Sequence, residues 1–167
     1  MRNLILLTMF LLAGCMGLKE PLVVAPDSSV KVYLIADSLL ESDKVQLEQV
    51  LNARHIQVTN ENDFDSYKLV IKRLNHHSRD LYADMETHNL YITLNSLVEA
   101  EFSDRQRGEF LWNKTLKVQT NFSPNAHFYS DKEWAKAELI WDQQRVLFNQ
   151  LIDEVIKSWK KDHPTGS

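Results

Sequence analysis

Three successive segments in the second half of the chain alternate apolar and polar residues with a period of two. They lie at residues 67–74, 90–96 and 110–119. In the first of them, Tyr67, Leu69 and Ile71 fall on one face and Lys68 and Lys72 on the other. Because successive side chains of a strand point to opposite faces of a sheet, we expect strands with one buried and one solvated face. Three such strands in a row predict an antiparallel meander, with the charged segments 76–86 and 99–108 as its connections.

The same alternation assigns faces to the other two strands. In the second strand one face carries Leu90, Ile92, Leu94 and Ser96, and the opposite face carries Tyr91, Thr93 and Asn95. In the third strand Phe110, Trp112, Leu116 and Val118 alternate with Leu111, Asn113, Thr115, Lys117 and Gln119. The more apolar set of each strand is expected to face the core.

Helical spacing occurs on both sides of the meander. It predicts an amphipathic helix over about residues 43–55 and a long helix over about 131–160. The apolar face of the long helix is traced by Ala137, Ile140, Trp141, Gln144, Phe148, Leu151, Ile152, Val155 and Trp159. Segments 30–36 and 56–59 are expected to be further strands. The fold class is therefore α+β: a two-layer sandwich of β-α-β-β-β-β-α order, with two helices packed on one face of a four- to five-stranded, mostly antiparallel sheet.

The N-terminal residues have the features of an export signal. Arg2 is followed by a short, mainly apolar run at 4–12 and by two small residues. A transmembrane helix needs about 20 apolar residues, so residues 1–14 are expected to be a signal peptide. The stretch 12–15 resembles the lipobox of bacterial lipoproteins, whose cysteine is lipidated after the preceding peptide is removed. The resemblance implies a covalent diacylglycerol and an N-acyl chain, such as palmitate, on Cys15.

Cys15 is the only cysteine, which argues against a plain signal peptide and excludes an internal disulfide framework. Met16 follows it, and under the usual sorting rule a residue other than aspartate there directs a lipoprotein to the outer membrane. Residues 15–29 contain two prolines and are expected to form an extended tether. Residues 30–160 are long enough for a single domain, and 161–167 are expected to be a flexible tail.

Catalytic signatures are scarce. No serine lies in a Gly-x-Ser-x-Gly turn, and the few glycines form no phosphate-binding loop. His76 and His77 are adjacent, so on a strand they would point to opposite faces and could not easily share a metal ion; with His88 they are expected to be solvated. The net charge of −4 argues against general nucleic-acid binding. We therefore expect no enzyme activity, no metal and no cofactor apart from the covalent lipid.

Aromatic and basic side chains supply the candidates for a contact surface. Trp141, Phe148 and Trp159 are expected to pack in the core, whereas Trp134, Tyr82, Phe128 and Tyr129 are candidates for exposed contacts. The basic residues expected near the same edge are Arg73, Arg79, Arg105, Arg107, Lys114, Lys117, Lys132 and Lys136. Such side chains pair with anionic groups, phosphate included, although ordinary surface charge is the alternative for each.

Three stretches connect the chain to a known family: Tyr67-Lys68-Leu69-Val70-Ile71, Leu90-Tyr91-Ile92-Thr93-Leu94 and Phe128-Tyr129-Ser130-Asp131. Together with the lipobox, the proline-bearing tether, the meander and the long closing helix, they make the chain similar to the lipopolysaccharide-assembly lipoproteins of the LptE family. The likeness covers about residues 30–160 and is one of pattern, not of a rigid motif.

The resemblance implies that the domain plugs the β-barrel of the translocon protein LptD in the outer membrane. Proteins of this family help that barrel to fold and contact lipopolysaccharide on its way to the cell surface, without catalysis. Their contacts are thought to involve basic residues at one end of the sheet and at the start of the last helix, which here are Arg79, Lys132 and Lys136. The hairpin tip departs from the family by carrying Asp84 and Glu86 in place of a basic, Gly-containing turn.

Another class of function stays open. Periplasmic lipoproteins of this size also act as regulatory or accessory binding modules for a cell-wall synthase or a lipid transporter. A periplasmic hydrolase has little support from the residues.

Overall fold

A computed structural model describes residues 30–84, 89–123 and 129–164, with backbone alone at 80–84, 89–91 and 129–132. Within these residues the elements are β1 (Lys31–Ile35), α1 (Glu41–Ala53), β2 (Gln57–Thr59), β3 (Tyr67–Asp84), β4 (Asn89–Asp104), β5 (Glu109–Phe122) and α2 (Tyr129–Asp162). The order is the one that the sequence predicts, so the α+β class is confirmed. None of the helices in this part of the chain is both long enough and apolar enough to cross a membrane.

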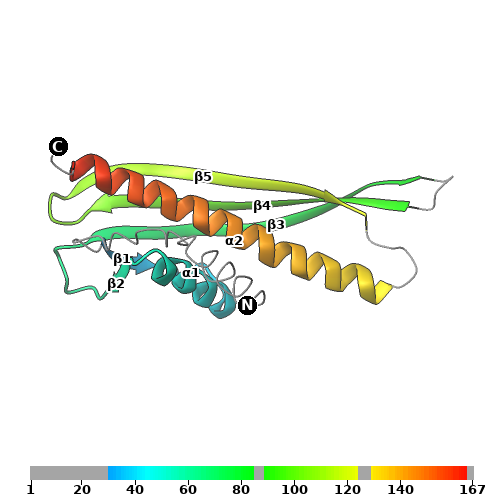
Figure 1. Cartoon of the computed structure of the whole chain (residues 1–167), viewed down its shortest axis with the longest axis horizontal. Helices are drawn as coiled ribbons and strands as arrows, with labels where there is room; N and C mark the ends of the chain where they lie inside the picture. The colour runs from blue at the N-terminus through cyan, green and yellow to red at the C-terminus, as the bar shows by residue number, and fades with distance from the viewer. Residues whose placement is uncertain (1–29, 85–88, 124–128, 165–167) are drawn as a thin grey trace, which may run out of the picture.

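The sheet has the strand order β2-β1-β3-β4-β5. β1 runs parallel to both β2 and β3, whereas β3, β4 and β5 form the predicted antiparallel meander. The sheet is therefore mixed, although its antiparallel ladders are much the longer ones. Figure 1 shows α2 lying diagonally along the three long strands, with α1 beside it.

One buried cluster joins the two layers. It contains Leu47 of α1, Leu69 of β3, Phe102 of β4 and Phe148 of α2, each of them fully buried. Both helices thus cover the same face of the sheet. Burial of an apolar side chain of this size contributes roughly 1.5–3 kcal/mol, so the shared cluster is the main stabilising feature.

The meander strands are longer than the alternation predicted. β3 continues through His76 to Asp84, and β4 continues through Glu99 to Asp104, so most of the two expected connections is strand. A β-bulge at Lys72 explains why the pattern was obscured, since Ile71 pairs with Ala100 and Arg73 with Glu99. The extra residue moves the core-facing positions of β3 from odd to even numbers.

A bulge in β5 changes the face on which Phe110 lies from the one predicted. Phe102 pairs with Trp112 and Ser103 with Phe110, which leaves Leu111 as the extra residue. Phe110 therefore lies opposite a residue of the other face and is 60% exposed, whereas Trp112 packs against the core. The alternation alone could not reveal this change, because Phe110 and Trp112 are two residues apart.

Trp141 also departs from its predicted place. Its side chain is 46% exposed, and the buried residues at this level of α2 are Gln143 and Gln144. The backbone carbonyl of Trp141 accepts a hydrogen bond of 3.1 Å from Nε2 of Gln46, so α1 packs against the backbone of α2 here. Phe148 is buried as predicted, and Trp159 packs at the margin of the core.

Helix α1 ends in a left-handed residue that is not glycine. His55 has φ of 56°, the N–H of His55 donates to the carbonyl of Asn52, and the N–H of Ile56 donates to that of Leu51. These are the two hydrogen bonds of a Schellman motif, in which the residue after the helix takes a left-handed conformation. The motif turns the chain directly into β2.

Candidate ligand-binding site

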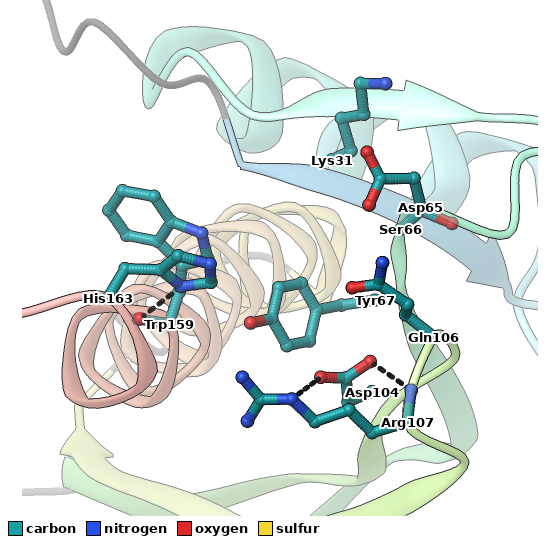
Figure 2. Close-up of a pocket in the computed structure, with 9 residues that line it drawn as sticks. All are labelled: Lys31, Asp65, Ser66, Tyr67, Asp104, Gln106, Arg107, Trp159 and His163. Atoms are coloured by element: carbon teal, nitrogen blue, oxygen red, sulfur yellow. Dashed lines mark hydrogen bonds and ion pairs between the residues drawn. The ribbon is translucent and has the colours of Figure 1, made fainter.

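A cleft opens at the end of the sheet where β1 begins and where β4 and α2 end (Figure 2). Its volume is about 230 Å³, and its lining consists of Lys31, Asp65, Ser66, Tyr67, Asp104, Gln106, Arg107, Trp159 and His163. Lys31 is the first residue of β1. The cleft therefore lies beside the point at which the tether expected from the sequence would enter the domain.

One wall of the cleft is the tight turn between β4 and β5. Asp104 is buried at the end of β4, and its Oδ1 accepts the backbone N–H of Arg107 at 3.1 Å. Its Oδ2 lies 3.6 Å from Nε of the same arginine. Gly108 closes the turn with φ of 66°, which glycine adopts without strain. Asp104 and Arg107 therefore largely balance each other's charge.

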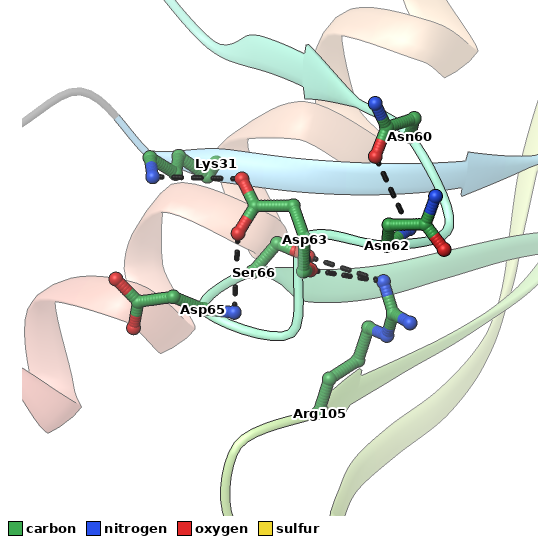
Figure 3. Close-up of polar contacts among 7 residues, drawn as sticks. All are labelled: Lys31, Asn60, Asn62, Asp63, Asp65, Ser66 and Arg105. Carbon is green, nitrogen blue, oxygen red and sulfur yellow. Dashed lines mark hydrogen bonds and ion pairs between the residues drawn. The ribbon is translucent and has the colours of Figure 1, made fainter.

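The opposite wall is the loop between β2 and β3, which Arg105 holds in place (Figure 3). Its guanidinium donates hydrogen bonds to the carbonyl oxygens of Glu61 at 2.7 Å and Asp63 at 3.0 Å. The same group lies over the ring of Tyr33, 4.6 Å from the centroid. A planar guanidinium can make both kinds of contact, because its donors lie in the plane and its faces can stack.

Asp63 organises the edge of this loop. Its Oδ2 lies 3.5 Å from Nζ of Lys31, and its Oδ1 accepts the N–H of Asp65 at 3.2 Å. The hydroxyl of Ser66 donates to the carbonyl oxygen of Asp63 at 2.5 Å. The hydroxyl proton of Ser66 is thus engaged in a hydrogen bond within the loop, which argues against the use of Ser66 as an activated nucleophile.

Aromatic rings form the floor of the cleft. Tyr67 stacks on Phe102 with ring centroids 5.1 Å apart, and Trp159 stacks on His163 at the same separation. Burial raises the pKa of Tyr67 to about 12, and the nearby carboxylates of Asp162 and Asp104 add to the shift. The phenol therefore stays protonated at neutral pH and can donate a hydrogen bond, but it cannot serve as a base there.

The cleft can hold a small polar group. Among its lining residues, the carboxylate of Asp104 is engaged by Arg107 and the hydroxyl of Ser66 is bound to the loop. Across the residues that the structure describes, no three His, Cys, Asp or Glu side chains gather as metal ligands would.

The contact residues predicted from the resemblance do not converge. Arg79 is exposed on β3 and pairs with Thr93, on the face of the sheet opposite the helices. Lys136 is partly buried on α2, in the other layer. Lys132 belongs to α2, but its side chain lies outside the described part, as does all of Cys15. The sheet thus separates Arg79 from the layer that carries Lys136.

Most of the other basic candidates have partners. Arg73 pairs with Glu99 at 3.6 Å, and Lys114 pairs with Glu154 of α2. Arg105 and Arg107 lie at the cleft, at the opposite end of β4 from Arg79, so the basic residues do not share one edge. Trp134 is 69% exposed, in agreement with its prediction as a surface residue.

Two residues of the cleft, Tyr67 and Trp159, are predicted by the sequence pattern to lie on buried faces. A third, Arg107, is one of the basic candidates for a contact surface. The sequence holds no local signal for the cleft, because its walls come from chain segments that meet only in the folded sheet.

A buried polar chain links the two layers away from the cleft. Nδ1 of His76 lies 2.7 Å from the hydroxyl of Ser96, which donates to Oε1 of Gln143 at 2.5 Å. The amide of Gln143 in turn donates to the carbonyl of Leu94 at 3.2 Å. The prediction that His76 is solvated is therefore wrong, because its side chain is partly buried. His77 is exposed on the other face, as predicted. The prediction that the two histidines diverge is confirmed.

The sequence matches no protein-family model and no curated protein. Its fold is similar to that of rare lipoprotein B from Shewanella oneidensis, with a TM-score of 0.61 at 12% identity, over 80% of this chain and 96% of that one. Lipoprotein B from Nitrosomonas europaea gives 0.58 at 17% identity, over 77% and 83% of the two chains. A minor lipoprotein from Acinetobacter baumannii gives 0.56 at 18% identity, over 81% and 92%. At these identities the likeness establishes a shared fold, one that occurs in bacterial lipoproteins.

Proposed function

We propose that this protein is an outer-membrane lipoprotein, anchored through Cys15, that plugs a β-barrel of the LptD type. In this role it assists assembly of the barrel and helps to deliver lipopolysaccharide to the cell surface, and it catalyses no reaction. The observation that carries the proposal is the polar character of the sheet face that the helices leave uncovered.

That face is mainly polar over the described side chains of the meander. From Lys68 to Arg79 in β3, from Thr93 to Ser103 in β4 and from Phe110 to Asn121 in β5, the outward-pointing residues are polar except for Val70, Leu97 and the exposed Phe110. The lumen of a large outer-membrane barrel is polar too, because its apolar side chains face the lipid. A polar sheet face can therefore lie inside such a lumen without exposing a large apolar area to water.

The length of the sheet is compatible with this role. At about 3.3 Å per residue the 18 residues of β3 span roughly 60 Å. The apolar band of an outer-membrane barrel is about 25 Å tall. A domain of this length can fill the lumen and still extend into the periplasm, towards the lipid anchor.

Two independent likenesses support the anchor and the family. The fold is shared with solved lipoproteins, among them rare lipoprotein B. The sequence stretches around Tyr67, Leu90 and Phe128 resemble the LptE family.

Crosslinking in intact cells tests the proposal directly. A photo-reactive residue is placed at Thr115 on the open sheet face, at Trp134 on the helical layer, or at the buried Leu69 as a control. A plug is surrounded by its barrel, so we expect crosslinks to one outer-membrane barrel protein from both exposed positions and none from Leu69.

Other outcomes would contradict the proposal. Crosslinks to a soluble or inner-membrane protein, with none to a barrel, would favour an accessory module of a cell-wall synthase or lipid transporter. Barrel crosslinks from Trp134 alone would indicate docking on the rim instead of insertion.

A further inference from the structure

Six residues form two adjoining rows on the open face of the meander. One row is His77, Asn95 and Gln119, and the next is Asn75, Leu97 and Lys117, as the strand register pairs them. We call these six residues the amide field. Thr93, in the following row towards the hairpin tip, donates to Oδ1 of Asn121 at 2.9 Å. Side chains in adjacent strands of such rows lie about 5 Å apart, so one ligand can contact several of them at once.

The amide field is hollowed. A depression of about 310 Å³ is lined by Asn95, Ser96, Leu97, Lys117, Val118 and Gln119. Ser96 and Val118 belong to the positions that face the helices, so their backbone forms the floor. The other four residues point outward and form the walls. The hollow is thus bounded by two amides, one ammonium group and one leucine.

Among the described side chains of this face, ion pairs occur only nearer the cleft. Lys72 pairs there with Glu101 at 2.5 Å and Arg73 pairs with Glu99 at 3.6 Å, so these two cations are balanced. The amide field contains no carboxylate, and Lys117 has no ion pair with any residue whose side chain the structure describes. Arg79, one row further towards the tip, is likewise exposed. The amide field therefore carries one unbalanced positive charge, although the whole chain carries a net charge of −4.

The chemistry of the field indicates its ligand. Amide side chains donate and accept hydrogen bonds, which suits the hydroxyl groups of a sugar. An ammonium group suits a phosphate. Leu97 lies between them and can pack against the C–H face of a sugar ring. These six positions include no aromatic or arginine side chain of the kind that anchors a protein partner, so the barrel contacts of the plug are expected outside the amide field.

We propose that the amide field binds a saccharide that carries phosphate groups. The inference rests on the proposed function, since it assigns the carbohydrate part of lipopolysaccharide to a defined place on the plug. It places that contact on the open sheet face, with Lys117, Asn95 and Gln119 as its main groups. None of these three was singled out as a contact by the resemblance.

The test uses the full chain purified in detergent and de-acylated lipopolysaccharide saccharide as the probe. Calorimetric titration is expected to show binding, with affinity at least fivefold lower for the same saccharide after phosphatase treatment. Lys117→Ala is expected to weaken binding about tenfold, the usual effect of one lost charge-assisted hydrogen bond. Binding is also expected to weaken as salt is raised.

Matched variants separate the field from general surface charge. Lys68→Ala removes an equal charge from the same face outside the field and is expected to leave the affinity unchanged. The double variant Asn95→Ala and Gln119→Ala keeps every charge and is expected to weaken binding by at least fivefold. Equal losses in Lys68→Ala and Lys117→Ala, or inorganic phosphate binding as tightly as the saccharide, would overturn the inference.

The two proposals can fail separately. If no saccharide binds while the barrel crosslinks from Thr115 and Trp134 are present, the inference that the amide field binds a saccharide is wrong. The proposed role as a plug is then unaffected. If the saccharide binds and no barrel is crosslinked, saccharide binding by the amide field is supported and the proposed role as a plug is wrong.

Discussion

His76 is a partly buried histidine whose tautomer is fixed by its hydrogen-bond partners. The hydroxyl of Ser96 gives its one proton to Gln143, so it must accept a hydrogen bond from Nδ1 of His76. The neutral imidazole with its proton on Nδ1 satisfies this chain. Burial lowers the pKa of His76, with Asp43 acting weakly in the opposite direction. The folded protein therefore favours the neutral form more than the unfolded chain does.

This leads to a prediction about stability and pH. Because the folded pKa lies below the unfolded value of about 6.5, the unfolded chain binds more protons as the pH falls through this range. The free energy of unfolding should therefore be highest above about pH 6.5 and fall below it, by at most about 1.4 kcal/mol per pH unit for this one group. Urea unfolding at pH 7.5, 6.5 and 5.5 measures the loss, which should be smaller in His76→Gln.

His77 provides the control for that experiment. It is adjacent in sequence but exposed on the other face of β3. The variant His77→Gln should lose as much stability as the unmodified protein between pH 7.5 and 5.5. An identical pH profile for His76→Gln and the unmodified protein would show that His76 does not contribute.

At the scale of one element, α2 consists of two unlike halves. The second half carries Leu147, Phe148, Leu151, Ile152 and Val155, all fully buried. From 133 to 142 no residue is buried, and Figure 1 shows the first turns diverging from the strands. Tertiary packing, more than propensity, stabilises most helices in proteins.

We therefore predict a gradient of hydrogen exchange along α2. Backbone amides at 134–142 should exchange at least tenfold faster than those at 147–157, because their opening breaks few buried contacts. Mass spectrometry of overlapping peptides from the purified chain measures both rates. Equal protection in the two halves would indicate that the first half packs on something beyond the described residues.

The same element shows what the sequence could predict. The apolar stripe correctly marked Phe148, Leu151, Ile152 and Val155, since their spacing keeps them on one face of any straight helix. It failed at Trp141, because helical spacing cannot reveal where a helix leaves the sheet. Which turns are covered depends on the length and direction of the strands beneath them.

The strands give the complementary lesson. Alternation placed Ile92, Leu94 and Ser96 on the core face of β4, which has no extra residue along this stretch. It failed for Phe110, because an extra residue in β5 shifts the pairing without changing the sequence pattern. The amide field has the same origin: Lys117 and Gln119 were expected on one face, but the rows that join them to Leu97 and Asn95 exist only once the register is known.

At the scale of the whole molecule, the single core predicts a single unfolding transition. The buried cluster joins Leu47 of α1, Leu69 of β3, Phe102 of β4 and Phe148 of α2, so neither layer has a separate core. Phe148→Ala should therefore destabilise both layers together, by about 3–5 kcal/mol. Trp134→Ala, which removes a side chain that is 69% exposed, should change the stability by less than about 0.5 kcal/mol.

Urea unfolding followed by far-ultraviolet circular dichroism reports the secondary structure, and tryptophan fluorescence reports the packing around Trp112 and Trp159. Coincident transitions are expected from the two probes in both variants. If the curves separate in Phe148→Ala, the helical layer can detach from the sheet, and a plug built on this fold could open along that boundary.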